Sequence, residues 1–105
     1  MEEAKVYLIL ETTYNFDEGA NNGSTNKLHQ LFYNRVFKDV DDAFHVLDKH
    51  VSIQRKTNGV VNLKEEEIKE INDYYKEVVS SHARKGYKLN NIAHCYVVRE
   101  VVLVD

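Results

Sequence analysis

The chain has only one cysteine, which excludes a domain held together by internal disulfides. It also has no apolar run long enough to cross a membrane, which excludes a membrane-spanning helix. Cys95 cannot form an internal disulfide, so we expect a protein of the reducing cytoplasm. Residues 1–5 are acidic and the apolar run at 6–10 is short, so no signal peptide is expected. Proline is also absent, but that absence is compatible with any fold class.

An excess of positive charge is also missing. The formal net charge is −3, which provides no general attraction to nucleic acid or anionic lipid. What is present suits a small globular protein, with 43% hydrophobic and 30% charged residues. A length of 105 residues is sufficient for one core, so residues 1–105 are expected to form a single domain.

Three segments have the composition of β-strands. Residues 6–14 begin with a continuous apolar run, which is typical of a central strand covered on both faces. Residues 28–37 and 92–104 are the other two, the last interrupted by an exposed or bulged point at 99–100. Residues 15–27 are polar and aperiodic and are expected to form a long hairpin loop. Alternation in the second strand predicts two faces: Leu31, Tyr33 and Phe37 on one, Phe32 and Val36 on the other.

Two helices are expected between the second and third strands. Asp39 is a candidate N-cap for the first, whose apolar stripe extends to Val51. Residues 52–61 are ambiguous, and we favour a break with some extended structure over a hairpin. The second helix is predicted within the stretch 62–86, with Asn62 as its N-cap and Gly86 as the C′ residue that follows its last turn.

The expected fold class is therefore α+β, with the order β-β-α-α-β. A small, three-stranded, mainly antiparallel sheet carries both helices packed on one face, and the first strand is central. Such a sheet leaves edge strands available, so a homodimer formed through an edge strand is expected.

An acidic row on the second helix is the feature most suggestive of a partner. Its members recur at three- and four-residue steps: Glu66, Glu70, Asp73 and Glu77. The row is predicted to bind a basic protein surface, although the neighbouring lysines also fit a merely solvated face. Asp17 and Glu18, in the long polar loop, are the second predicted contact region, although the loop equally fits a flexible solvent loop.

Two other functions are less favoured. A nucleic-acid or nucleotide binder would use Arg84, Lys85 and Lys88 with the aromatic ring of Tyr87. A small enzyme lacks any convergent acid, base and nucleophile, and would need a pocket containing His82 or Cys95 with a perturbed pKa. No catalytic residue is therefore assigned.

The histidines and the cysteine have ordinary structural explanations. The five histidines lack the convergent spacing of a metal site, so no metal and no cofactor is expected. His94 and Cys95 are adjacent on a strand, so their side chains are predicted to point to opposite faces. Cys95 is expected to be a small buried hydrophobe rather than a nucleophile.

Several short patterns can be compared with known proteins: Lys5-Val6-Tyr7-Leu8-Ile9, Val36-Phe37, Asp39-Val40-Asp41-Asp42-Ala43 and Val98-Arg99-Glu100-Val101-Val102-Leu103. Together they resemble a loose group of small uncharacterised proteins that are frequent in phage and bacterial mobile-element genomes. The resemblance covers about half of the chain, and the long acidic helix departs from the shorter members. It implies a compact fold and a phage or mobile-element setting, and no active site.

The function predicted from the sequence is a non-enzymatic binding module that contacts a host protein. The acidic helix and the long polar loop are its expected contact surfaces. No membrane partner is expected.

Overall fold

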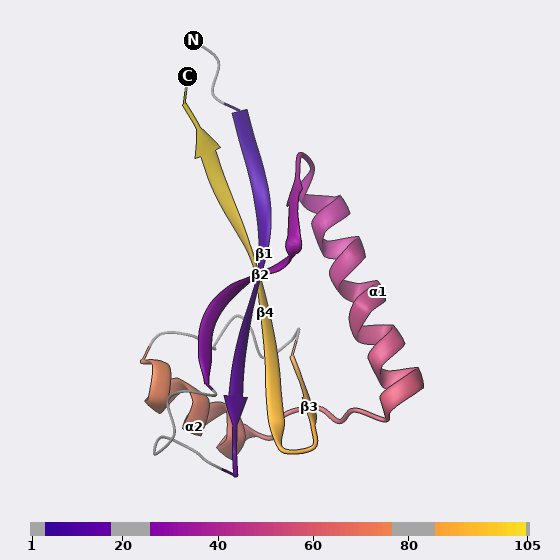
Figure 1. The fold of residues 1–105 in the computed structure, drawn as a ribbon, viewed down its shortest axis with the longest axis vertical. Helices are drawn as coiled ribbons and strands as arrows, with labels where there is room; N and C mark the ends of the chain where they lie inside the picture. Colours follow the sequence, from indigo (N-terminus) through magenta and orange to yellow (C-terminus); the bar gives the residue numbers. More distant parts are fainter. Residues whose placement is uncertain (1–3, 18–25, 77–85, 105) are drawn as a thin grey trace.

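The computed structural model describes residues 4–17, 26–76 and 86–104, which form a four-stranded antiparallel sheet and two helices (Figure 1). The elements are β1 (Ala4–Asn15), β2 (Lys27–Phe37), α1 (Val40–Asn58), α2 (Glu65–Tyr75), β3 (Tyr87–Leu89) and β4 (Ile92–Leu103). The strand order β2-β1-β4-β3 confirms the α+β class and the interior position of the first strand.

The longest ladder joins β1 to β4. It extends from the pair Ala4–Leu103 to the pair Asn15–Ile92 without a register shift. The β-branched and aromatic residues of both strands favour this extended pairing. The residues at 99–100 are exposed, as expected, but they form no bulge against β1.

β2 contains the irregularities instead. Leu31 pairs with Leu10 and Val36 pairs with Leu8, so four residues of β2 lie opposite one residue of β1. Asn34 has a φ of 51° within this bulge, which we call the β2 bulge (residues 32–35). The bulge breaks the period-two alternation. Phe32 and Phe37 therefore share one core cluster, and their predicted placement on opposite faces was wrong.

The prediction of three strands was also wrong, because the short β3 pairs with the start of β4. Asn90 and Asn91 join the two strands with φ values of 50° and 63°. Positive φ at both central residues defines the turn type that matches the twist of a tight hairpin. A single bridge between Val61 and Lys88 adds a further pairing beside β3.

α1 begins as predicted and ends later than predicted. The Asp39 side chain accepts a hydrogen bond from the Asp41 backbone N–H at 2.8 Å, as an N-cap does. The helix continues through the ambiguous segment to Asn58, and Gly59 then adopts a φ of 59°. A left-handed glycine at this position ends a helix at no steric cost. The extended structure expected near residue 61 is the Val61 bridge.

α2 is much shorter than the helix predicted over 62–86. Its N-cap is Lys64 rather than Asn62, and the helix ends where Lys76 turns left-handed with a φ of 64°. The predicted C-terminal Gly86 is instead buried directly before β3. The rest of the predicted helix, 77–85, lies outside the described residues.

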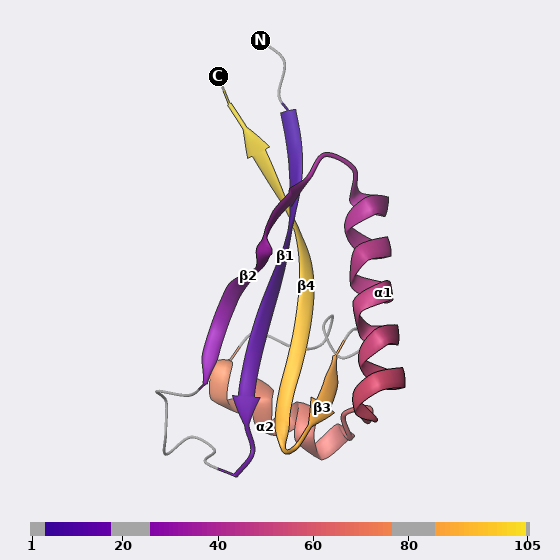
Figure 2. The ribbon, with the colours of Figure 1, turned by 45° about the vertical axis from the view of Figure 1, so that its right-hand side comes forward.

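The two helices pack on opposite faces of the sheet, which corrects the expectation that both share one face (Figure 2). Alternate residues of a strand point to opposite sides. In β4, Tyr96 joins the core cluster of α1, whereas its neighbour Cys95 joins the cluster that contains Ile71 of α2. In β1, Ile9 belongs to the first cluster and Tyr14 to the second.

Glu67 connects the start of α2 to the sheet. Its Oε1 accepts from the Lys64 backbone N–H at 2.9 Å, and its Oε2 accepts from Lys88 Nζ at 2.5 Å. Burial raises the pKa of Glu67, but the hydrogen bonds from Lys88 and Lys64 outweigh burial, so the net pKa is lowered. The ionised carboxylate is therefore part of the folded structure.

We predict that Glu67→Gln lowers the free energy of unfolding by about 1–2 kcal/mol at pH 7, because a largely buried charged hydrogen bond is lost. Glu65→Gln, at an exposed position of the same helix turn, is the control. Thermal unfolding measures both. The difference between wild type and Glu67→Gln should vanish as the pH falls through the lowered pKa of Glu67. Equal losses in the two variants would contradict this assignment.

Candidate functional site

Part of the predicted acidic row lines one hollow between α2 and β1. The hollow has a volume of about 390 Å³. We call it the acidic hollow, and it is lined by Tyr14, Glu66, Lys69, Glu70, Asp73 and Tyr74. The helical spacing brings the three carboxylates to the same side of α2. Glu77, the fourth predicted member of the row, lies outside the described residues.

Tyr14 of β1 positions the carboxylate of Glu70. Its side chain is 2% exposed, and its hydroxyl donates a 2.7 Å hydrogen bond to Glu70 Oε2. The ring packs edge-on against Tyr74 and Phe16, with centroids 5.3 and 5.1 Å away. Burial, followed by the Glu70 carboxylate, raises the pKa of Tyr14 to about 12. Tyr14 is therefore a fixed donor that holds Glu70 at the wall of the acidic hollow.

The acidic hollow carries excess negative charge. Lys69 Nζ lies 2.7 Å from Asp73 Oδ2 in an exposed i, i+4 ion pair. Glu66 forms no ion pair with any residue that the structure describes. Three carboxylates against one ammonium leave two negative charges uncompensated within the lining. The site is thus suited to a cationic group.

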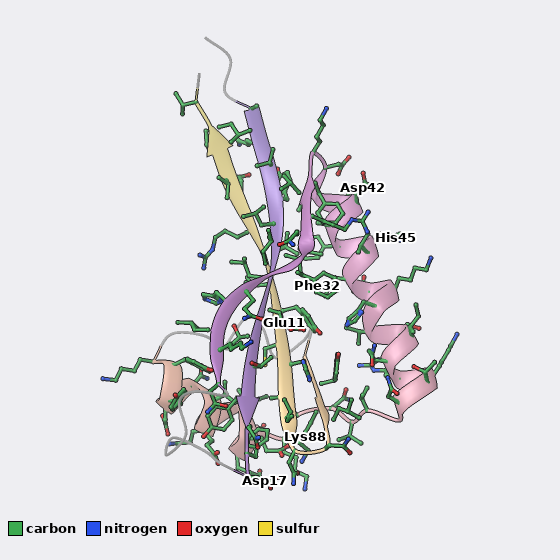
Figure 3. All side chains as sticks on the ribbon, in the orientation of Figure 1. Glu11, Asp17, Phe32, Asp42, His45 and Lys88 are labelled. Atoms are coloured by element: carbon green, nitrogen blue, oxygen red, sulfur yellow. The ribbon has the colours of Figure 1, made fainter. Side chains whose placement is uncertain are left out.

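The second predicted contact region is separate from the acidic hollow. Asp17 (labelled in Figure 3) follows β1. Its Oδ1 accepts a hydrogen bond from Asn91 Nδ2 at 3.0 Å. Asp17 does not line the hollow, so its described role is to connect the end of β1 to the β3–β4 turn. Glu18 and most of the polar loop lie outside the described residues.

Of the four residues of the predicted nucleic-acid surface, the structure describes two, Tyr87 and Lys88. Tyr87 is 4% exposed, so its ring is not available for stacking on a base. The ammonium of Lys88 is paired with Glu67, and this pair leaves it little charge for a phosphate. Arg84 and Lys85 lie outside the described residues. The described half of this set therefore gives the alternative function no support.

A network of polar side chains lies on the other face of the sheet, beneath α1. The Tyr96 hydroxyl is 3.1 Å from the Tyr87 hydroxyl and 3.2 Å from His50 Nε2. It also interacts with the Glu11 carboxylate of β1 (labelled in Figure 3). A hydroxyl carries one proton, so donation to Glu11 leaves Tyr96 accepting from Tyr87 and His50. We call these residues, with His94, the tyrosine–histidine network.

His94 extends the network along β4. Its ring stacks on Tyr87 with centroids 5.1 Å apart, and its Nδ1 lies 3.5 Å from Glu11 Oε2. This separation is longer than an ordinary hydrogen bond, and His94 Nδ1 is buried without a hydrogen-bond partner among the residues that the structure describes. Burial raises the pKa of Glu11, but His94 and Tyr96 outweigh it and hold the pKa below its ordinary value.

Cys95 lies on the opposite side of β4 from this network, as predicted. It is 1% exposed, and burial raises the pKa of its thiol to about 12. A thiol of this kind is protonated at neutral pH and is a weak nucleophile. The prediction of a small buried hydrophobe is confirmed. His82, the other residue considered for an enzyme, lies outside the described residues.

The tyrosine–histidine network was missed by sequence reasoning. Its members come from four separate elements, so no local spacing joins them. The available signals were Glu11 within an apolar strand and the alternation of His94 with Tyr96 on one face of β4. Among the described residues, no group of three potential ligands is arranged to hold a metal ion.

The predicted homodimer has an available edge. On β4, β3 covers only Ile92–His94, so most of that side of β4 has no strand beside it within the described ranges. Val102 and Leu103, at the end of β4, are 42% and 53% exposed. Dimer formation through this edge stays a prediction.

Comparison of the chain with family models, curated proteins and solved structures found no match. The resemblance to small phage and mobile-element proteins therefore stays a prediction. Across the described ranges, neither helix has the length and apolar character required to traverse a bilayer.

The network generates a prediction about acid stability. Burial lowers the pKa of His50 below its ordinary value of 6.5, and Glu11 opposes this shift. The unfolded chain therefore takes up a proton at higher pH than the folded chain. Stability should therefore fall as the pH drops through the unfolded-state pKa of about 6.5 toward the lower folded-state pKa of His50.

We predict that His50→Gln reduces the dependence of folding stability on pH, because it removes one of the groups responsible. Part of this dependence should remain, because burial also lowers the pKa of His29. The control is His45→Gln, at an exposed position of the same helix (Figure 3). Urea unfolding across the pH range is the measurement. An unchanged pH dependence in His50→Gln would show that His50 is not buried as described.

Proposed function

We propose that the protein is a non-enzymatic binding module whose acidic hollow accepts a cationic side chain of a partner protein. The observation that supports this most strongly is the convergence of Glu66, Glu70 and Asp73 on one hollow. A row that was merely solvated would need no hollow beside it and no buried tyrosine to hold one of its members.

The lining also favours a guanidinium or ammonium over a metal ion. Tyr74 presents an aromatic ring at the wall, and a cation over such a ring gains about 0.5–1 kcal/mol at an exposed site. Glu66 and Glu70 provide carboxylate acceptors, and bidentate pairing with arginine adds geometric specificity. An arginine-bearing segment of a host protein is therefore the proposed partner. A phage or mobile-element origin of the chain is part of the same proposal.

The test is titration of the ¹⁵N-labelled protein with a short arginine-rich peptide. We expect amide shifts concentrated on α2 and the end of β1, and weaker binding at higher salt. Glu70→Lys/Asp73→Lys should weaken the affinity by about tenfold or more, because two favourable charge contacts become repulsive.

The matched control is Asp42→Lys/Asp48→Lys, which makes the same change in net charge on the exposed side of α1. It should retain most of the affinity. If both double variants lose binding equally, the attraction comes from overall charge and the acidic hollow is not the site. Circular dichroism of each variant verifies that the fold is intact.

A further inference from the structure

A second hollow, of about 330 Å³, lies between the β2 bulge and α1. β2 contributes Phe32 and Arg35 to its lining. The contribution of α1 recurs at three- and four-residue steps, which define one helix face: Val46, Lys49, His50, Ile53 and Gln54. We call this the basic hollow. It is on the opposite face of the sheet from the acidic hollow.

The ionisable side chains of the basic hollow are all bases. Arg35 and Lys49 carry positive charge at neutral pH, His50 is the third base, and among the residues that the structure describes no carboxylate is part of the lining. This concentration of bases occurs in a chain with a net charge of −3. The electrostatic preference of the basic hollow is therefore local and opposite to that of the whole molecule.

Apart from Gln54, the rest of the described lining is apolar. Phe32 is 6% exposed and forms the base of the hollow, with the His50 ring edge-on to it at a centroid distance of 4.8 Å. Ile53 is 46% exposed at the rim. Small-molecule sites combine apolar walls with a few polar groups that fix orientation, and this volume is within their usual range of about 300–1,000 Å³.

We propose that the basic hollow binds a small organic phosphate. The phosphate oxygens accept from the Arg35 guanidinium and the Lys49 ammonium, and the apolar body of the ligand packs against Phe32 and Ile53. The planar fork of arginine suits two phosphate oxygens at once, while lysine acts as a point charge. Arg35 belongs to the β2 bulge and lines the hollow, so the irregular backbone of the bulge contributes a phosphate-binding side chain in this proposal.

His50 links this site to the tyrosine–histidine network. Glu11, His94, Tyr87 and Tyr96 face it from the sheet, and Arg35 of β2 and Lys49 of α1 line the same hollow. An anion bound beside His50 favours its protonated form. Ligand binding should therefore raise the pKa of His50, which NMR can follow at the imidazole.

The test uses phenyl phosphate as the probe with the full chain, measured by calorimetry and amide shifts at pH 7.5. We expect one site, with shifts in β2 and α1. Arg35→Gln and Lys49→Gln should each weaken the affinity about tenfold, the effect of one lost charged hydrogen bond. Lys56→Gln, in the exposed last turn of α1, should have no effect.

Phenol and inorganic phosphate should each bind at least about tenfold more weakly than phenyl phosphate, because each has only half of the recognised chemistry. If inorganic phosphate bound as tightly as phenyl phosphate, the claim that the hollow recognises the apolar body of the ligand would be wrong. Absence of phenyl phosphate binding, or an equal loss in Lys56→Gln, would overturn all of it. Glu70→Lys/Asp73→Lys should bind phenyl phosphate normally, so this result does not depend on the acidic hollow.

Discussion

The whole structure depends on burial of both faces of the β1–β4 ladder. The two strands pair along their full lengths without a register shift, so their side chains alternate strictly between two sides. Each side then requires a cover of its own. α1 covers the side that contains Ile9 and Tyr96, and α2 covers the side that contains Tyr14 and Cys95. Two separate hollows follow from this constraint, since each helix forms one with the sheet.

Tyrosine hydroxyls connect the core to both sites. Tyr14 carries its hydroxyl from the buried side of β1 to a carboxylate of the acidic hollow. On the other side, Tyr96 and Tyr87 connect the sheet to His50 at the basic hollow. A buried tyrosine combines a large apolar area with one polar group that needs a partner. The same residue type therefore stabilises the fold and fixes the polar groups of each site.

The sequence predicted what depends on local pattern. Apolar density identified three strands, and Asp39 marked the start of α1. The acidic row was visible because Glu66, Glu70 and Asp73 recur at helical spacing, and these three share one helix face. What was missed depends on contacts between distant segments or on single backbone angles. β3 has three residues and is recognisable mainly by the turn after it. α2 ends at Lys76 because this residue adopts a left-handed backbone conformation. The helical spacing of apolar residues in the sequence continues beyond Lys76, so the pattern gave no sign of this end. The tyrosine–histidine network requires four elements to be assembled first.

The chain has two separate aromatic and polar clusters, one on each face of the β1–β4 ladder. A nuclear Overhauser spectrum of the aromatic and imidazole protons tests it most directly. We predict cross-peaks from His50 to Phe32 and Tyr96, whose ring centroids are 4.8 and 5.6 Å away, and from Tyr14 to Tyr74, at 5.3 Å. Cross-peaks between His50 and either Tyr14 or Tyr74 would place both helices on one face and contradict the account.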